Sequence, residues 1–509
     1  MLDLGTSFLA SVERDPGAMA IAEGDLTLNY FDWYRRISAL VDGLGQIGLR
    51  KGDTLVTAMQ NRWENASLHW ACQLAGIVAT PVNWRVTADE LDHALRDSAA
   101  RVLVHDDAAA AAVAGSALAA DIGVVPLEGK NGLTVMLAGR AADAGPQAGA
   151  DDLSVMLYTS GTTSKPKGVP RRHRAERAAA IAHVAQNLYH HGERTLGVMP
   201  LYHTMGIRSL LSASVIGGAF ICLPRFDVPG ALDAIETHRV TNLYLVPTLY
   251  HDIVHHTEFT SDRVASVRKL GFAGASMTDG LLQKLEEAFQ PDHFVNHYGS
   301  SEIYTFSICQ NAAAKPGSAG RAAINQRLRV VPLGAEDASK VCAPGEEGEI
   351  VASMQGDEAF EGYWNRPEAD RKAIRDGWYF TGDCGVFDDD GDLFVTGRTD
   401  DMIITGGENV SPVEVESCLS LHPAVAEVAV VGLPDPRWGK VVTAFVKRAG
   451  DVTEDDLDAH CRNSELSNFR RPRRYVFVRD IPKSPVGKLL RRLLVAGEYE
   501  AETTETTTA

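Results

Sequence analysis

Long apolar runs, paired cysteines and an excess of basic residues are all missing from this 509-residue sequence. Without a stretch of about 18 apolar residues, a membrane-spanning helix is not expected, and residues 1–4 do not begin a basic-then-apolar signal segment. The seven cysteines are scattered with no CxxC pair, which is typical of reduced thiols. These absences predict a soluble, cytoplasmic protein with reduced thiols rather than a disulfide framework.

The charge balance excludes a second class of protein. The chain has 49 Lys and Arg against 67 Asp and Glu, a net charge of −18. A protein that binds duplex nucleic acid by neutralising phosphates needs the opposite excess, so we expect no nucleic-acid partner and no membrane partner. A small anionic ligand is still compatible with this balance, because a local basic pocket can form in an acidic protein.

The first four hundred residues alternate short apolar segments with helical patterns. A strand is predicted over 54–59, an amphipathic helix over 65–74 and a strand over 77–82, which together form a βαβ unit. Further strands are predicted at 101–104, 242–246 and 270–273, and a helix is predicted over the Ala-rich segment 107–120. The fold class is therefore α/β.

A second, compact α/β unit begins near residue 400. Ser411, Pro412 and Glu414 predict a helix start, and strands are predicted at 425–431, 441–446 and 475–478. We divide the chain into a large domain of residues 1–399, a small domain of residues 400–494 and a tail of residues 495–509. The tail is expected to be disordered, because its end consists of Thr, Glu and Ala.

Residues 158–168, Tyr-Thr-Ser-Gly-Thr-Thr-Ser-Lys-Pro-Lys-Gly, form the most distinctive segment. Two glycines allow close backbone approach, while hydroxyls and two lysines suit phosphate oxygens. The segment is not a Walker A loop, because Pro166 stands where that motif needs glycine. On composition alone, a Ser/Thr-rich surface loop without a ligand remains an equal alternative.

Three more segments follow in a characteristic order: residues 297–302 (His-Tyr-Gly-Ser-Ser-Glu), the run from 377–383 through Arg398 to 400–409, and residues 482–488 (Pro-Lys-Ser-Pro-Val-Gly-Lys). With residues 158–168 they resemble the acyl-adenylate-forming, or AMP-binding, superfamily, up to about Leu494. Segments 199–203, 272–276, 435–439 and 464–475 resemble its 4-chlorobenzoate–CoA ligase branch. The resemblance implies a large multi-sheet N-terminal domain and a small mobile α/β C-terminal domain.

The resemblance also implies an activity. A carboxylic acid–CoA ligase uses ATP with Mg²⁺ to activate a carboxylate as acyl-AMP, releases pyrophosphate, and then forms the thioester with coenzyme A. The expected acid is aryl, alicyclic or short- to medium-chain acyl, and whether the protein is a homodimer stays open. The alternative is a stand-alone adenylating enzyme that loads the thiol of a carrier protein.

By family position, Lys488 and His203 are the expected catalytic residues, Glu302 the ligand of Mg²⁺, and Asp400 the hinge. ATP and AMP are expected to contact Thr159, Ser160, Gly161, Thr162, Thr163, Lys165, Lys167, Gly274, Ala275, Ser276, His297, Tyr298, Gly299, Ser300, Ser301, Asp383 and Arg398. The acid is expected to contact His203, Thr204, Met205, Ile207, His297 and Gly299, and coenzyme A to contact Gly407, Trp438, Phe469 and Arg471.

Several positions keep a second interpretation. Ser164 replaces a usual glycine and Ser301 a usual threonine, so Ser164 could strain the phosphate loop if its φ is positive. The arginines near Arg471 suit CoA phosphates, although a solvated basic face would look the same. Arg208 lies off the apolar stripe of its helix, which favours a surface or salt-bridge role. The alternative is that Arg208 and His297 bind a polar or second acidic group of the acid.

Overall fold

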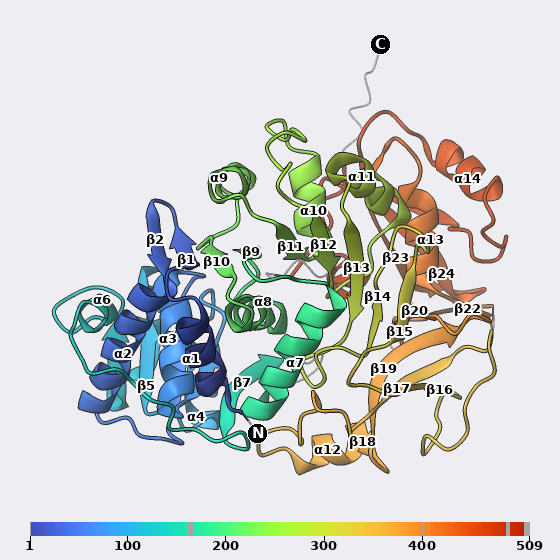
Figure 1. Cartoon of the computed structure of the whole chain (residues 1–509). Coiled ribbons are helices and arrows are strands. Elements are labelled where there is room, and N and C mark those ends of the chain that lie inside the picture. The colour runs from blue at the N-terminus through green and yellow to red at the C-terminus, as the bar shows by residue number, and fades with distance from the viewer. Residues whose placement is uncertain (1, 160–165, 400, 407, 485–488, 503–509) are drawn as a thin grey trace.

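The structure is a computed structural model that describes residues 2–159, 166–399, 401–406, 408–484 and 489–502. Within these residues, two sheets and their helices form a large N-terminal domain, and a third sheet forms a small C-terminal domain (Figure 1). The predicted α/β fold class is confirmed. Among the described residues we find no helix with both the length and the apolar character that crossing a bilayer requires.

The first sheet of the large domain has six strands in the described part of the chain, and all neighbours are parallel except the last pair. In spatial order the strands are β6 (Gly123–Pro126), β5 (Val102–His105), β3 (Thr54–Ala58), β4 (Val78–Pro81), β7 (Leu153–Thr159) and β8 (Lys167–Arg172). The predicted strands at 54–59, 77–82 and 101–104 are therefore correct to within about a residue.

The second sheet changes character at its middle. One half is a parallel array, apart from the antiparallel edge strand β2: β13 (His293–Tyr298), β12 (Lys269–Phe272), β11 (Asn242–Leu245), β9 (Arg194–Gly197), β10 (Ala219–Cys222), β1 (Met19–Glu23) and β2 (Leu26–Asn29). The other half is antiparallel: β14 (Ser307–Cys309), β15 (Ser318–Ala322), β20 (Leu393–Arg398), β19 (Trp378–Phe387), β17 (Gly348–Ser353) and β16 (Leu328–Val331), with β18 (Ile374–Arg375) beside β19. The turn of the β19–β20 hairpin contains Asp388, Asp390 and Asp392, which all contact Lys315.

The helices of the large domain cover and connect these sheets (Figure 1). They are α1 (Leu4–Arg14), α2 (Tyr30–Gln46), α3 (Trp63–Ala75), α4 (Ala88–Asp97), α5 (Ala110–Gly115), α6 (Leu133–Leu137), α7 (His173–Gln186), α8 (Thr204–Val215), α9 (Val228–His238), α10 (Pro247–Val254), α11 (Asp279–Phe289) and α12 (Pro367–Ala373).

Two helix predictions need correction. Helix α3 is not amphipathic, because its residues are buried on every side, including Asn65 and Gln73. Their amides donate hydrogen bonds to backbone carbonyls, so these polar side chains are satisfied without solvent. The segment 107–120 is not one helix: α5 ends at Gly115, and 3₁₀ turns lie at Asp107–Ala109 and Ala119–Asp121.

The small domain packs helices on a sheet made of β22 (Glu408–Val410), β21 (Ile403–Thr405), β24 (Gly439–Arg448), β23 (Val425–Asp435) and β25 (Arg474–Phe477). Its helices are α13 (Pro412–Ser420), α14 (Glu454–Arg462) and α15 (Arg491–Ala496). The predicted strands and helix start at Ser411 are present, and the Ser411 side chain accepts a hydrogen bond from the Glu414 N–H. The boundary that we place between residues 399 and 400 lies between β20 and β21 and stays a prediction.

The expectation of a disordered tail is wrong for residues 495–502. Ala501 pairs with Val478, and the Tyr499 ring packs edge-on against Phe445 at 4.9 Å between centroids. Arg448 Nε donates to a carboxylate oxygen of Glu502 at 2.6 Å. Residues 503–509 lie outside the described residues.

The two domains touch through helices. Helix α11 of the large domain packs on α13 of the small domain, where a Cβ added to Gly280 would lie 2.5 Å from the Ser420 carbonyl oxygen. Nearby, the His251 ring on α10 lies 3.1 Å from the Ala426 carbonyl oxygen on β23. In this arrangement only glycine fits at position 280 without a shift of the neighbouring backbone.

Candidate active site between the domains

A cleft of about 1230 Å³ separates the two domains and contains most of the predicted site residues. Its large-domain walls come from the loops that follow β12 and β13, from β19 and β20, and from the start of α8. Its small-domain wall includes α13 and part of β23. Because the carboxyl ends of parallel strands β12 and β13 open onto it, the cleft has the position at which open α/β sheets bind ligands.

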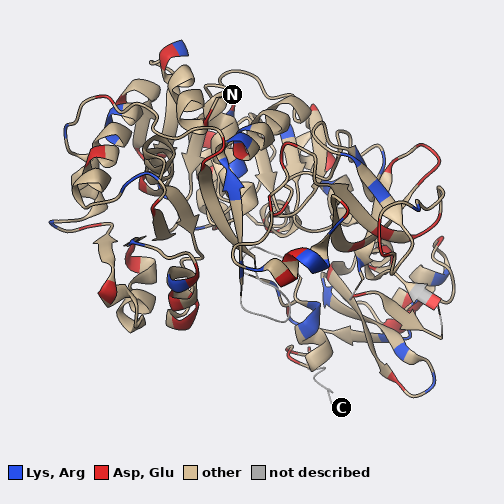
Figure 2. Ribbon diagram, turned by 90° about the horizontal axis from the view of Figure 1, so that it is seen from below, with Lys and Arg blue, Asp and Glu red and all other residues tan. Residues whose placement is uncertain are grey.

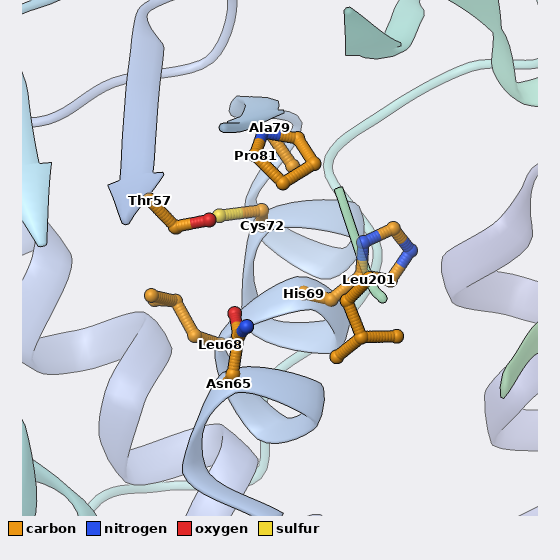
Figure 3. A pocket seen from close by; sticks show the side chains of 8 residues that line it. All are labelled: Thr57, Asn65, Leu68, His69, Cys72, Ala79, Pro81 and Leu201. Atoms are coloured by element: carbon orange, nitrogen blue, oxygen red, sulfur yellow. The ribbon is translucent and has the colours of Figure 1, made fainter. Parts of the chain in front are cut away.

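A second cavity lies inside the large domain and has a different character. Figure 3 shows Asn65, Leu68, His69 and Cys72, all from α3, facing residues of β3, β4 and Leu201. Its volume of about 10 Å³ corresponds to roughly one water molecule. Burial lowers the pKa of His69 to about 3, so this imidazole is neutral. The cavity is too small for a substrate.

The predicted phosphate loop begins and ends at the cleft. Thr159, the last residue of β7, pairs with Lys167, the first residue of β8, and both line the cleft. Lys167 Nζ lies 4.0 Å from the centroid of the Tyr363 ring. The middle of the loop lies outside the described residues, namely Ser160, Gly161, Thr162, Thr163, Ser164 and Lys165.

Tyr298, Asp383 and Arg398 form a hydrogen-bonded group on the cleft wall. The Tyr298 hydroxyl donates to Asp383 Oδ2 at 2.6 Å, and Arg398 Nη1 lies 2.9 Å from Asp383 Oδ1. Asp383 and Arg398 are directly opposite each other in the β19–β20 pairing. Burial, and then the Asp383 charge, raise the pKa of Tyr298 well above its usual value, so its phenol stays protonated and donates.

The turn after β12 lies on the same cleft. Gly274, Ala275 and Ser276 all line it, and Gly274 has a φ of +84°, which favours glycine. The predicted nucleotide contacts of the described residues are thus brought together, although they are spread along the chain from Thr159 to Arg398.

Residues 299–302 after β13 form a tightly packed turn. A Cβ on Gly299 would lie 2.0 Å from the Tyr304 carbonyl oxygen, so the turn requires glycine. Ser301 Oγ lies 3.2 Å from Thr204 Oγ1, and the Ser300 N–H donates to the Ile303 carbonyl oxygen. The Glu302 carboxylate is buried and accepts a 2.6 Å hydrogen bond from the Tyr363 hydroxyl at Oε1.

Arg171, which the sequence analysis did not single out, holds this turn from behind. Its side chain and that of Glu176 are fully buried, with Arg171 Nε 2.6 Å from Glu176 Oε1. Arg171 Nη1 donates to the carbonyl oxygens of Glu302 (3.0 Å) and Glu358 (2.7 Å). The Tyr304 hydroxyl donates to the other oxygen of Glu176 at 3.1 Å. Arg171 therefore fixes the backbone at Glu302, the predicted metal ligand. No sequence motif around Arg171 predicts this role.

The start of α8 supplies a further wall. His203 caps this helix, since its Nδ1 accepts from the Met205 N–H at 3.3 Å, and His203, Thr204 and Met205 line the cleft. Ile207 does not: it is fully buried in the hydrophobic core with Leu210 and Leu211. Its predicted contact with the acid is therefore not supported by its position.

Arg208 is not on the surface, so the expectation of a surface role is wrong, and among the described residues no carboxylate forms a direct ion pair with it. Its side chain is 2% exposed, and it lines the cleft together with His297. It donates to the Tyr304 carbonyl oxygen, Thr305 Oγ1 and the Tyr244 hydroxyl. These neutral acceptors take the place of the carboxylate that a salt bridge would need.

The small domain brings Lys483 and Leu489 to the cleft. These residues pair across the loop that contains Lys488, and Lys483 Nζ lies 2.6 Å from Glu427 Oε2. Lys488 itself, the hinge residue Asp400 and the predicted CoA contact Gly407 lie outside the described residues. The described flanks of the loop that contains Lys488 thus line the same cleft as the predicted nucleotide contacts.

The basic residues of the small domain are largely paired with acids of the same domain. Arg471 contacts Asp458, and the further pairs are Arg470 with Glu414, Arg474 with Asp435, and Arg491 with Glu416. Figure 2 shows Lys and Arg interspersed with Asp and Glu over the molecule. Two other predicted CoA contacts are more accessible, with Trp438 45% and Phe469 41% exposed. Within the described residues, these four arginines are therefore paired with acids rather than left free for a ligand.

Comparisons with known proteins match nearly the whole chain. The family model for AMP-binding enzymes matches residues 8–364, and the model for the AMP-binding enzyme C-terminal domain matches residues 414–488. A 4-chlorobenzoate–CoA ligase from Arthrobacter sp. is 35% identical over 498 residues, covering 95% of this chain and 93% of the relative. A feruloyl-CoA synthase from Amycolatopsis sp. is 34% identical over 502 residues, covering 96% and 97%.

A solved structure has the same two-domain fold. ATP-bound MatB from Rhodopseudomonas palustris superimposes with a TM-score of 0.87 at 28% identity, covering 97% of this chain and 99% of that one. Each of the three matches extends over both domains, and together they confirm the resemblance that the sequence motifs predict.

Proposed function

Because the chain belongs to the family of AMP-binding enzymes and is an AMP-forming acyl-CoA synthetase, we propose that it joins a carboxylic acid to coenzyme A in two steps. First, a carboxylate oxygen attacks the α-phosphorus of ATP and pyrophosphate leaves. Second, the CoA thiolate attacks the carbonyl carbon of the acyl-AMP and AMP leaves. The acid that we propose is aryl, alicyclic or short- to medium-chain acyl.

The nucleotide would lie along the group of Tyr298, Asp383 and Arg398. Asp383 would accept hydrogen bonds from the two ribose hydroxyls, with its orientation held by Tyr298 and Arg398. Gly274, Ala275 and the Tyr298 ring would flank the adenine. The phosphates would be bound by Thr159, Lys167 and the loop between them, whose backbone N–H groups, hydroxyls and lysines suit that charge.

Magnesium would be held by Glu302. Its carboxylate is a hard oxygen ligand whose Oε1 is fixed by the Tyr363 hydroxyl, which fits a cation that prefers oxygen donors and retains water. Bound there, Mg²⁺ would neutralise charge on the phosphates. Arg171 contributes by fixing the backbone of the turn, so that the carboxylate is preorganised before ATP binds.

The small domain has two roles in this proposal. Lys488 would stabilise the charge that develops between carboxylate and α-phosphate, and the described flanks of its loop already line the cleft. Trp438, Phe469 and Gly407 would contact coenzyme A, with Arg471 joining them only after leaving Asp458. Two different roles of one small domain favour rotation about the hinge at Asp400 between the half-reactions.

The observation that carries the proposal is one cleft that contains Lys167, Glu302 and the group of Tyr298, Asp383 and Arg398. The test is a panel of carboxylic acids assayed for acid-dependent ATP–pyrophosphate exchange without CoA, and for AMP release with CoA. A CoA thioester formed with no carrier protein present supports the proposal. Absence of exchange with every acid, for a protein shown to be folded, would contradict it.

A stand-alone adenylating enzyme for a carrier protein is the second candidate, since both classes share the first half-reaction. It predicts pyrophosphate exchange without any CoA-dependent release of AMP. The two CoA ligase relatives, which match this chain over nearly their full length, favour free CoA as the acceptor.

A further inference from the structure

A group of buried polar side chains lies beside the predicted contacts of the carboxylic acid in the cleft. It consists of His297 on β13, Arg208 on α8, Asn187 and His183 at the end of α7, and Tyr244 on β11. His297 and Arg208 both line the cleft, and each is 2% exposed. Among the described residues, His297 Nδ1 and Arg208 Nε have no hydrogen-bond partner. Buried polar atoms are rarely left in that state, so each one needs an explanation.

Asn187 determines which nitrogen of His297 carries the proton. Asn187 Nδ2 donates to the His183 carbonyl oxygen at 2.7 Å and faces His183 Nδ1 at 3.2 Å. The Asn187 Oδ1 atom therefore faces His297 Nε2, at 3.0 Å, and accepts its N–H. This network assigns the proton of neutral His297 to Nε2 and leaves a lone pair on Nδ1.

His297 remains neutral, so Nδ1 keeps its lone pair. Burial, and then the charge of Arg208, hold its pKa well below the usual value. In the part of the chain that the structure describes, the groups that face its ring from the neighbouring elements are His183, Asn187, Tyr244 and Arg208, and none of these is a carboxylate. His297 Nδ1 is therefore a hydrogen-bond acceptor only.

Arg208 offers the complementary property. Its two terminal nitrogens donate to Tyr304, Thr305 and Tyr244, whereas Nε keeps an N–H without an acceptor in the described part of the chain. The guanidinium also lies 5.3 Å from the centroid of the Tyr244 ring, against which the His297 ring packs at 5.0 Å and the His183 ring at 4.8 Å. An acceptor-only atom and a donor-only atom thus flank the same tyrosine.

We propose that His297 and Arg208 select a carboxylic acid that carries a neutral hydroxyl group. The hydroxyl would donate to His297 Nδ1 and accept from Arg208 Nε, so that one small group satisfies both atoms. A second carboxylate could accept from Arg208 but, having no proton to donate, would leave His297 Nδ1 unpaired, and an apolar acid would leave both atoms unpaired. The inference rests on the proposed function, because it names the class of acid that the same cleft activates.

The test compares matched acids on three skeletons: benzoate, cyclohexanecarboxylate and hexanoate. Each skeleton is supplied unsubstituted, with a hydroxyl at each ring position or at the chain end, with fluorine in place of that hydroxyl, and as the dicarboxylate. The measured quantity is the ratio of kcat/KM for the hydroxyl acid to kcat/KM for the unsubstituted acid. We expect a ratio of about ten or more for one hydroxyl isomer, and no comparable gain from fluorine or carboxylate.

Variants assign the preference to its residues. His297→Leu should bring the ratio close to one. Asn187→Leu should lower the ratio, because the proton of His297 is then no longer held on Nε2. Met205→Leu, on the same wall, should change both acids by the same factor and keep the ratio. If His297→Leu fails to fold, the wild-type ratios alone still decide the matter.

Three outcomes would overturn the inference: a wild-type preference for unsubstituted acids, a preference for dicarboxylates, and a hydroxyl preference that survives in His297→Leu. In all three the enzyme still forms acyl-AMP, so the proposed function stands. Failure to activate any acid would instead overturn the proposed function, and this inference with it.

Discussion

Replacing Arg171 by methionine should destabilise the large domain strongly. Among the described residues, the substitution leaves the fully buried Glu176 carboxylate with only the Tyr304 hydroxyl as a donor, and it removes the donor to the carbonyl oxygens of Glu302 and Glu358. Breaking a buried ion pair by removing one partner costs about 3–5 kcal/mol. Native proteins are stable by only about 5–15 kcal/mol, so this is a large share.

Arg172 provides a matched control on the same strand. It also pairs with a glutamate, Glu361, but these two side chains are 33% and 50% exposed, and exposed pairs contribute about 0–1 kcal/mol. At about 2 °C per kcal/mol, Arg171→Met should lower Tm by about 6–10 °C and Arg172→Met by about 2 °C or less. The assay is thermal unfolding followed by near-UV circular dichroism and by intrinsic fluorescence.

A second variant separates the charge effect from the loss of packing. Arg171→Met combined with Glu176→Gln removes both charges, so the double variant should be more stable than Arg171→Met alone. The KM for ATP should rise in Arg171→Met, because the Glu302 turn loses its support. Equal Tm shifts for Arg171→Met and Arg172→Met would refute the reasoning.

Three further predictions address the small domain. Lys488→Ala should reduce acyl-adenylate formation on the order of a hundredfold while thioester formation from supplied acyl-AMP and CoA largely survives; equal losses would contradict its role. Trp438→Ala should raise the KM for CoA more than that for ATP, and Arg471→Ala should raise the KM for CoA more than that for pantetheine, which lacks the nucleotide phosphates. Equal effects of Arg471→Ala on CoA and pantetheine would show that Arg471 serves only its pair with Asp458. The pKa of Cys418 is lowered chiefly by a hydrogen bond from the Cys461 thiol, so peptide mapping should find iodoacetamide on Cys418 first at pH 7; labelling of Cys461 first would refute this.

Strand positions were predictable where apolar residues were packed from both sides. The segments 54–59, 242–246 and 270–273 are short apolar runs, and each is a strand within a parallel array. Helix α3 shows the limit of the same method, because periodicity assigns polar residues to the solvent. Gln73 is polar and fully buried. Its Nε2 donates to the Ser154 carbonyl oxygen, and its Oε1 accepts from the Ser154 hydroxyl, so both ends of the amide are satisfied inside the core. Such a pairing partner is invisible in the local sequence.

In the site, too, residues within motifs could be predicted, whereas residues whose roles depend on distant partners could not. Asp383 and Tyr298 belong to motifs that can be recognised, and the structure brings them within 2.6 Å of each other. Arg171 and Asn187 have no motif, because their roles depend on which distant backbone or ring they meet. Arg208 was misplaced for the opposite reason: a cation off the apolar stripe of a helix is usually solvated, whereas here neutral acceptors on β11 and after β13 surround it.

The contact at Gly280 has a consequence for the balance between domain orientations. A single methyl group there would collide with the Ser420 carbonyl oxygen, and only in arrangements that keep α13 against α11. Alanine at position 280 would therefore act as a thermodynamic bias, raising the free energy of the orientation described above and leaving any orientation with the helices apart untouched. If the small domain rotates at Asp400 as proposed, Gly280→Ala would increase the population of the domain orientation that serves the other half-reaction, although the added carbon lies far from the reacting atoms.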